Sequence, residues 1–197
     1  MVTDYQRLYS GISKAAWGYV FLYFNININE VSLLPSFIGY LLFLAAIRAL
    51  EGEERELSLL KTFCVILAVW NAAVWISDWG FGDLEGRWPF ADLLISLINI
   101  YFQFQFVTNL ASIAEKYRTE DDDLHEKMLK YRTWQTIILT VVTISTTLVP
   151  STSEIWKYLS FAMAILYLIL VVCLMKALFD LRACIRQREG EEAPPQE

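Results

Sequence analysis

The chain is poor in the residues that small catalytic and metal sites use. It has one histidine, His125, and three cysteines, Cys64, Cys173 and Cys184, whose spacing matches no metal or redox motif. No H-E-x-x-H, no G-x-S-x-G and no pair of membrane aspartates occurs. We therefore expect no catalytic residue, no metal ligand and no cofactor, and predict that the protein is not an enzyme. An intramembrane enzyme that uses Cys64, Cys173 or His125 is kept as an alternative, ranked after the two functions given below.

Charge is also scarce. Charged residues make up 19% of the chain, against roughly 25% in soluble domains, whereas 56% of the residues are hydrophobic. The formal charge of −6 comes largely from acidic loops and the tail, and no basic patch with interleaved aromatics is present. This composition excludes nucleic-acid binding and predicts a membrane protein.

The apolar residues fall into six segments of membrane-crossing length. The fold class we predict is an all-α, polytopic integral membrane protein with six transmembrane helices in residues 1–188, followed by a disordered acidic tail in residues 189–197. Asn25 to Asn29 alternates with period two and predicts an extended connector, and Pro35 and Pro89 predict helix starts. The crossings are expected at about Ala15 to Phe24 (extended back toward Asp4), Leu33 to Leu50, Leu59 to Trp79, Phe90 to Ala114, Trp134 to Val149, and Ile155 to Leu178.

Positive charges alternate between the connectors. With the N-terminus inside, fourteen of the sixteen Lys and Arg residues fall on the inner side and only Arg87 and Lys157 on the outer side. This is the pattern of the positive-inside rule for an even number of crossings. It predicts a multi-pass protein of the cell membrane, of a bacterial inner or plasma membrane, with both termini cytoplasmic and the lipid bilayer as its first partner.

Polar residues in three neighbouring crossings recur at helical spacing. Steps of three and four residues place them on one face of each helix. If the fourth and fifth crossings form an antiparallel hairpin, Asp92 lies level with Thr147 and Asn99 with Thr140, so that two polar stripes align across the membrane. The expected seam is lined by Asn71, Trp75, Asp78, Asp92, Ser96, Asn99, Gln103, Thr136, Thr140 and Thr143.

The outer end of this seam is acidic and aromatic. Six carboxylates against Arg87 and Lys157 give the outer segments a net charge of −4, and Trp75 and Trp79 lie close by. Carboxylates with indole faces hold amines by charge and cation–π contacts. The sequence therefore predicts a small transporter, channel or solute-binding membrane subunit for a cationic or amine-bearing solute.

A plainer interpretation also stays open. Polar side chains in membrane helices often only join the helices, at about 0.6 kcal/mol each. The alternative is thus a non-transporting structural or accessory subunit, whose acidic inner segments, such as Glu51 to Glu56, dock a partner protein. Either version admits a homo-oligomer or a partner membrane subunit.

Overall fold

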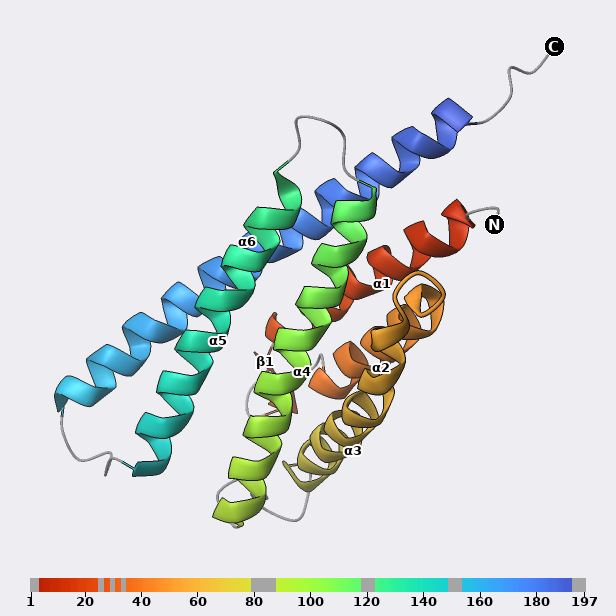
Figure 1. The fold of residues 1–197 in the computed structure, drawn as a ribbon. Helices are drawn as coiled ribbons and strands as arrows, with labels where there is room; N and C mark the ends of the chain where they lie inside the picture. The colour runs from red at the N-terminus through yellow and green to blue at the C-terminus, as the bar shows by residue number, and fades with distance from the viewer. Residues whose placement is uncertain are drawn as a thin grey trace.

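The computed structural model describes residues 4–24, 27–28, 31–32, 35–78, 88–117, 123–148 and 154–192. Six α-helices follow one another along these segments (Figure 1). They are α1 (Tyr5–Tyr23), α2 (Ser36–Leu50), α3 (Leu60–Asp78), α4 (Pro89–Lys116), α5 (Leu124–Leu148) and α6 (Glu154–Glu192), with a 3-10 turn, η1 (Arg55–Leu59), before α3.

The starts of α1, α2 and α4 follow from local chemistry. Asp4 caps α1 by accepting a 3.1 Å hydrogen bond from the Arg7 backbone N–H, which satisfies one of the free donors of the first turn. Pro35 has extended backbone angles and directly precedes α2, and Pro89 is the first residue of α4. The extension of the first helix back to Asp4 and the helix start at Pro89 are thereby confirmed.

The expected extended connector after α1 is confirmed for the residues that the structure describes. β1 (Asn27–Ile28) pairs antiparallel with β2 (Val31–Ser32), with Asn27 opposite Ser32 and Ile28 opposite Val31. Two boundaries differ from expectation. α5 begins at Leu124 rather than near Trp134, and α6 runs to Glu192, so residues 189–192 are helical rather than part of a disordered tail. The connectors between the third and fourth and between the fifth and sixth expected crossings, residues 79–87 and 149–153, lie outside the described residues.

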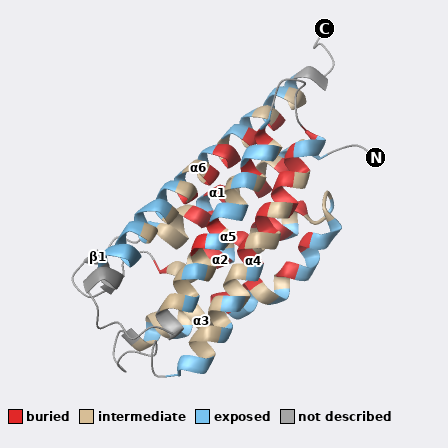
Figure 2. Ribbon diagram, turned by 60° about the vertical axis from the view of Figure 1, so that its left-hand side comes forward, coloured by how far each residue is buried: buried red, intermediate tan, exposed pale blue. Residues whose placement is uncertain are grey.

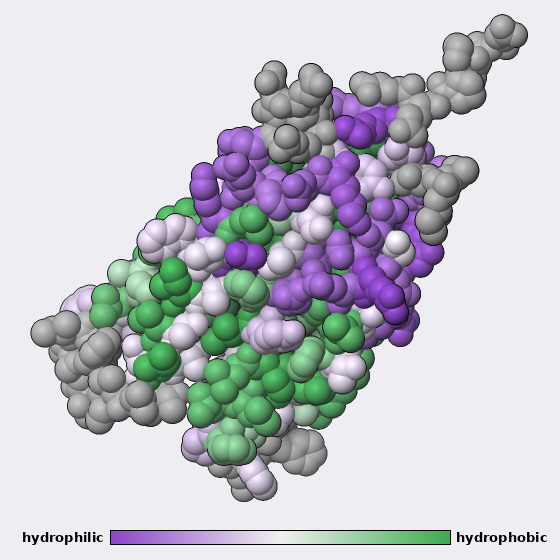
Figure 3. All heavy atoms as spheres, viewed as in Figure 1, coloured by the Kyte–Doolittle hydropathy of each residue, from purple (hydrophilic) through white to green (hydrophobic). Residues whose placement is uncertain are grey.

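The helices form a closed ring. Each packs against its neighbours in sequence, and α6 returns to pack on α1. α1 begins and α6 ends at the same end of the bundle (Figures 1 and 2). We call this the basic end, because Arg7, Arg48 and Arg182 lie toward it. Hydrophilic residues gather there on the face in Figure 3, and hydrophobic ones cover much of the rest.

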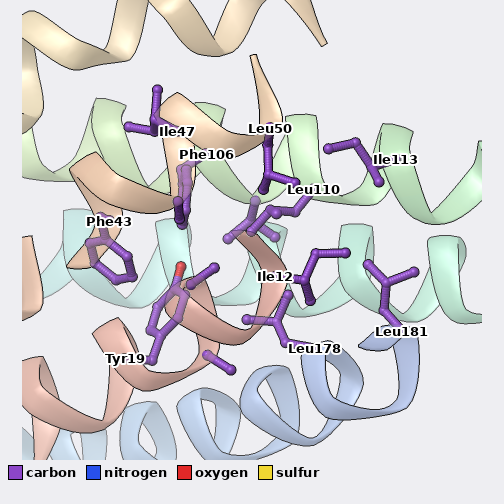
Figure 4. Close-up of a cluster of buried hydrophobic side chains, with 14 of the residues drawn as sticks. Ile12, Tyr19, Phe43, Ile47, Leu50, Phe106, Leu110, Ile113, Leu178 and Leu181 are labelled. Carbon is purple, nitrogen blue, oxygen red and sulfur yellow. The ribbon is translucent and has the colours of Figure 1, made fainter. Parts of the chain in front are cut away.

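The side chains that fill the interior of the ring are concentrated in the half of the bundle nearer the basic end. Figure 2 shows the buried residues gathered there, and Figure 4 shows Tyr19, Phe43 and Phe106 with aliphatic side chains from α1, α2, α4 and α6. Tyr19, Phe43, Phe102 and Phe106 are each 0% exposed. Many large apolar side chains point outward elsewhere, among them Phe90 at 81% and Phe161 at 67% exposure. The ring is therefore closely packed in one half and more open in the other.

Three helical segments are long and apolar enough to cross a membrane: Arg55–Ser77, Pro89–Lys116 and Tyr158–Gly190. The search covered only the described residues. Ser36–Leu50 is apolar but shorter. The protein is thus an all-helical bundle, apart from the four-residue hairpin, with three candidate membrane-spanning helices.

Candidate functional site: a polar hollow between α2, α3 and α4

A half-open hollow of about 410 Å³ lies in the less packed half of the ring. Its volume falls in the range of small-molecule pockets, about 300–1,000 Å³. We call it the polar hollow. Among the described residues, its lining comes from one residue of α2, three of α3 and four of α4: Tyr40, Leu67, Trp70, Asn71, Asp92, Ile95, Ser96 and Asn99.

The polar residues of α4 that line the hollow are the first members of the polar series expected on the fourth crossing. Asp92, Ser96 and Asn99 line it together, which follows from their spacing of four and then three residues. Along the helix axis the distance from Asp92 to Asn99 is about 10 Å at 1.5 Å per residue. All three side chains are half-buried, so each is in reach of a ligand entering the hollow.

Gln103, the next member of the stripe, lies one turn deeper and is not in the hollow. Its side chain is 4% exposed, and its Oε1 accepts a 2.8 Å hydrogen bond from the Tyr19 hydroxyl of α1. Its Nε2 is buried without a hydrogen-bond partner among the described residues. The polar face of α4 therefore points into the ring. Asp92, Ser96 and Asn99 line the hollow, and Gln103 is buried in the core.

Of the two expected α3 residues whose side chains the structure describes, Asn71 lines the hollow and Trp75 does not. Asn71 Nδ2 donates a 2.8 Å hydrogen bond to the Leu67 carbonyl of its own helix, which fixes the orientation of the amide. Trp75 instead packs edge-to-face on Phe37, with ring centroids 5.7 Å apart. Asp78 is the last residue of α3, and its side chain lies outside the described part.

Tyr40, Leu67, Trp70 and Ile95 line the hollow but were not expected from the sequence, and two of them are aromatic. The Tyr40 hydroxyl donates a 3.2 Å hydrogen bond to Asn99 Oδ1, and so joins α2 to α4 across the inner end of the hollow. The Tyr40 carbonyl accepts a 3.1 Å hydrogen bond from the Cys64 thiol of α3. Tyr40 lies in an otherwise apolar run and Trp70 directly precedes Asn71, but neither belongs to a series of polar residues at helical spacing.

The expected α5 residues Thr136, Thr140 and Thr143 are not among the residues that line the hollow. Asn99 and Gln103 bond to α2 and α1, while α5 meets a different face of α4. There, Arg132 Nη1 donates a 2.9 Å hydrogen bond to Thr108, and its guanidinium lies 4.3 Å from the Phe104 ring centroid.

Along their axes, α4 and α5 are aligned to within one helical turn of the expected register. The face of α4 that meets α5 is not the one that carries Gln103. Phe104 follows Gln103 and is turned by about 100° around the helix, so the two neighbours point to different helices. Thr136 donates a 2.9 Å hydrogen bond to the Arg132 carbonyl of its own helix. Thr140 and Thr143 are half-buried on α5, and the Thr147 side chain lies outside the described residues.

Below the hollow, aromatic rings close the interior. We call Tyr19, Phe43, Phe102 and Phe106 the aromatic floor. Phe102 and Phe106 stack with centroids 5.4 Å apart, and Phe43 lies 5.0 Å from both Phe106 and Tyr19. Tyr40, which borders the hollow, lies 6.2 Å from Phe102. The hollow is therefore closed at this level.

The acidic connector between α2 and α3 contacts the C-terminal part of α4, at the basic end of the bundle. Glu56 accepts a 2.9 Å hydrogen bond from Gln105, Glu54 one of 2.9 Å from Ser112, and Glu53 one of 2.9 Å from the Tyr117 hydroxyl. We call this set, with Lys116, the inner clamp; Lys116 Nζ lies 3.5 Å from Glu54 and also bonds the Glu53 carbonyl. Three of the connector's carboxylates thus have partners within the chain.

The residues kept for the enzyme alternative lie apart. His125 Nδ1 is 2.8 Å from the Ala111 carbonyl and 3.8 Å from Glu115, on the α4–α5 face. Cys64 is buried, and its thiol is directed to the Tyr40 carbonyl. Within the described ranges, no group of three or more His, Cys, Asp or Glu side chains could hold a metal ion.

Comparison with known proteins gives no match. No family model matches the chain, and neither a curated protein nor a solved structure is significantly similar to it. Function must therefore be argued from the polar hollow itself.

Proposed function

We propose that this chain is a six-crossing membrane protein, with both ends on the inner side, that binds a small cationic or amine-bearing solute in the polar hollow as a transport or solute-binding subunit. The observation that carries the proposal is the meeting of Asp92, Asn71, Asn99 and Trp70 in one half-open space of about 410 Å³.

Membrane embedding is supported by the three candidate spans and by the outward-facing apolar side chains on α3, α4, α5 and α6. The shorter or more polar helices α1, α2 and α5 would cross as members of the ring, where neighbours cover their polar faces. The basic end would lie inside by the positive-inside rule. The hollow, at the opposite half, would then open toward the outer side.

The chemistry of the lining suits a cation. The Asp92 carboxylate supplies a negative charge, and Trp70 and Tyr40 supply aromatic surfaces beside it. Ser96, Asn71 and Asn99 supply hydroxyl and amide groups that replace the water shell of a partly desolvated ammonium group. A neutral apolar solute would leave these groups unsatisfied, so charge is the expected basis of selectivity.

The aromatic floor favours a binding pocket over an open pore. Phe43, Phe102 and Phe106 are fully buried directly beneath Tyr40 and Asn99. Passage toward the inner side would require these rings to move, as in alternating access. In the proposed cycle the solute binds first from the outer side, and the floor opens in a second step.

The test is binding of tetramethylammonium to the protein in nanodiscs, with tert-butanol as the neutral probe of similar shape. We expect the cation to raise the melting temperature and tert-butanol not to. Asp92→Asn should reduce the cation's affinity at least tenfold, and Asn99→Leu should also weaken it. Asp123→Asn is the matched control, because Asp123 is exposed and far from the hollow along the chain. Equal shifts with both probes, or an unchanged affinity in Asp92→Asn, would refute the proposal.

The six-crossing topology needs its own experiment. In a cysteine-free variant, Gly52→Cys should react with a membrane-impermeant maleimide only after the inner side is opened, and Gly82→Cys should react in sealed cells. Both positions lie in expected connectors on opposite sides. Labelling of both from the same side would show that α3 does not cross the membrane.

One observation favours the alternative of a non-transporting structural subunit. Polar side chains bond each other between helices: Tyr19 to Gln103, Tyr40 to Asn99, and the Tyr23 hydroxyl to that of Tyr167 at 2.6 Å. Under this alternative Asn99→Leu lowers thermal stability without changing solute uptake in proteoliposomes, and the protein copurifies with a stoichiometric companion. The inner clamp occupies Glu53, Glu54 and Glu56, so a partner would have to dock elsewhere.

A further inference from the structure

A second hollow, of about 390 Å³, lies on the side of α1 that faces away from the interior of the ring, at the edge of α2. It runs along α1 from Tyr9 to Phe21, which is about 18 Å of helix at 1.5 Å per residue. That length is close to half of a hydrocarbon core of about 30 Å, the depth of one leaflet. We call it the α1 groove. It is separate from the polar hollow, since none of the residues that the structure describes lines both.

The α1 groove is polar and cationic at one end. Lys14, Ser10 and Ser13 line the part nearer the start of α1. Lys14 is half-buried and makes no ion pair with any residue in the described ranges. Arg182 of α6 joins this end, because its Nη1 donates a 3.4 Å hydrogen bond to Ser13 and its guanidinium lies 5.3 Å from the Tyr9 ring centroid.

The other end of the groove is apolar. Phe21 and Leu42 line it, and Trp17, 49% exposed, lies between the two ends. A tryptophan between cationic and apolar side chains is typical of a membrane interface. A ligand filling the whole groove would need an anion at one end and a hydrocarbon chain at the other.

We propose that the α1 groove binds one anionic phospholipid of the inner leaflet. Lys14 and Arg182 hold its phosphate, Ser10 and Ser13 donate hydrogen bonds to the phosphate oxygens, and an acyl chain lies along Phe21 and Leu42. A free phosphate would leave the apolar end unfilled, and a zwitterionic lipid would bring its own cation beside Lys14. The site needs the membrane placement proposed above but does not depend on solute binding in the polar hollow.

The test compares phosphatidylglycerol with phosphatidylcholine of identical chains, by native mass spectrometry and by thermal shift of the detergent-purified full chain. We expect phosphatidylglycerol to bind more tightly. Lys14→Gln should weaken it by roughly fivefold, which is about 1 kcal/mol, and should remove the headgroup preference. Lys14→Arg should keep the preference. Lys176→Gln is the matched control, because Lys176 is an exposed lysine of α6 outside the groove and should leave the affinity unchanged.

Two further sets of measurements distinguish a bound lipid from free phosphate, and the lipid site from the proposed solute site. Leu42→Trp, which fills the apolar end without changing charge, should weaken phosphatidylglycerol binding, and inorganic phosphate alone should give little thermal shift. Asp92→Asn should keep the lipid preference, and Lys14→Gln should keep tetramethylammonium binding. Equal binding of the two lipids, equal losses in Lys14→Gln and Lys176→Gln, or an inorganic phosphate shift matching that of the lipid would each overturn the lipid site.

Discussion

The Tyr19 hydroxyl donates a 2.8 Å hydrogen bond to Gln103 Oε1 inside a core where both side chains are nearly fully buried. The bond joins α1 to α4 across the ring, although the two residues are far apart in sequence. Gln103 Nε2 has no partner among the described residues. Gln103 is thus held by a single hydroxyl, and its amide is costly to bury without it.

Tyr19→Phe should therefore destabilise the protein by about 1–2 kcal/mol, because it leaves the whole Gln103 amide unpaired. Tyr19→Phe combined with Gln103→Leu should be more stable than Tyr19→Phe alone, since the second change removes the unpaired polar group. Denaturation in mixed micelles gives both values as a double-mutant cycle. Tyr158→Phe is the control, since Tyr158 is 72% exposed. If the double variant is the least stable of the set, the hydrogen bond is not what anchors Gln103.

The second relationship is the close backbone approach of α1 and α2. A Cβ on Gly39 would lie 2.8 Å from the Gly18 carbonyl oxygen and 3.1 Å from the Leu22 nitrogen. Small residues that allow such contact are a common means of joining membrane helices. Because the obstacle is backbone, it cannot rotate away as a side chain would.

Gly39→Ala should accordingly cost about 1–3 kcal/mol, by forcing the two helices apart. The melting temperature of the purified protein reports this loss. Gly52→Ala provides the matched control, because nothing lies within 4 Å of a Cβ at Gly52, and it should change stability by no more than about 0.5 kcal/mol. Equal melting temperatures for the two variants would mean that the α1–α2 approach is looser than the structure has it.

Helix positions could be predicted from the sequence because their signals are local. Pro35, Pro89 and the apolar runs predict where helices begin, and the period-two pattern at Asn25 to Asn29 predicts extended chain. The start of α5 was missed because four of the ten residues 124–133 are charged. The crossing was placed from apolar residues alone, whereas the helix extends beyond them. The membrane topology built on these runs stays a prediction.

The facing of the helices could not be predicted from the sequence. Spacing correctly groups Asp92, Ser96 and Asn99 on one face of α4, but it does not say which helix that face meets. We expected α5, the sequence neighbour, whereas the face meets α1 and α2 through Tyr19 and Tyr40. These contacts are long-range, and a tyrosine in an apolar run carries no mark of its hydrogen-bond partner.

The inner clamp should contribute to stability in a salt-dependent way. Glu54 accepts a hydrogen bond from Ser112 and lies 3.5 Å from Lys116 Nζ, with its side chain 21% exposed. Glu54→Ala should cost about 1 kcal/mol at low ionic strength, since it removes both interactions, and less at high salt. Urea denaturation at two salt concentrations measures the difference.

Its control is the surface pair Lys130–Glu126, one helical turn apart on α5. These side chains are about 3.8 Å apart and 72% and 71% exposed, so Glu126→Ala should cost no more than about 0.5 kcal/mol. A loss in Glu54→Ala that does not exceed that of Glu126→Ala would show that the connector is not fastened to α4.

The last prediction concerns the volume of the polar hollow rather than its charge. Ser96 lies on the α4 wall between Asp92 and Asn99 and is half-buried, so a larger side chain at this position would project into the space where the solute is proposed to bind. Ser96→Phe should reduce tetramethylammonium affinity at least tenfold while leaving the Asp92 carboxylate in place. Ala164→Phe adds the same ring to the exposed face of α6 and should leave binding unchanged. Isothermal titration of both variants in nanodiscs decides the matter: if Ser96→Phe binds the cation as the native chain does, the cation is held elsewhere and the hollow is only a gap in packing.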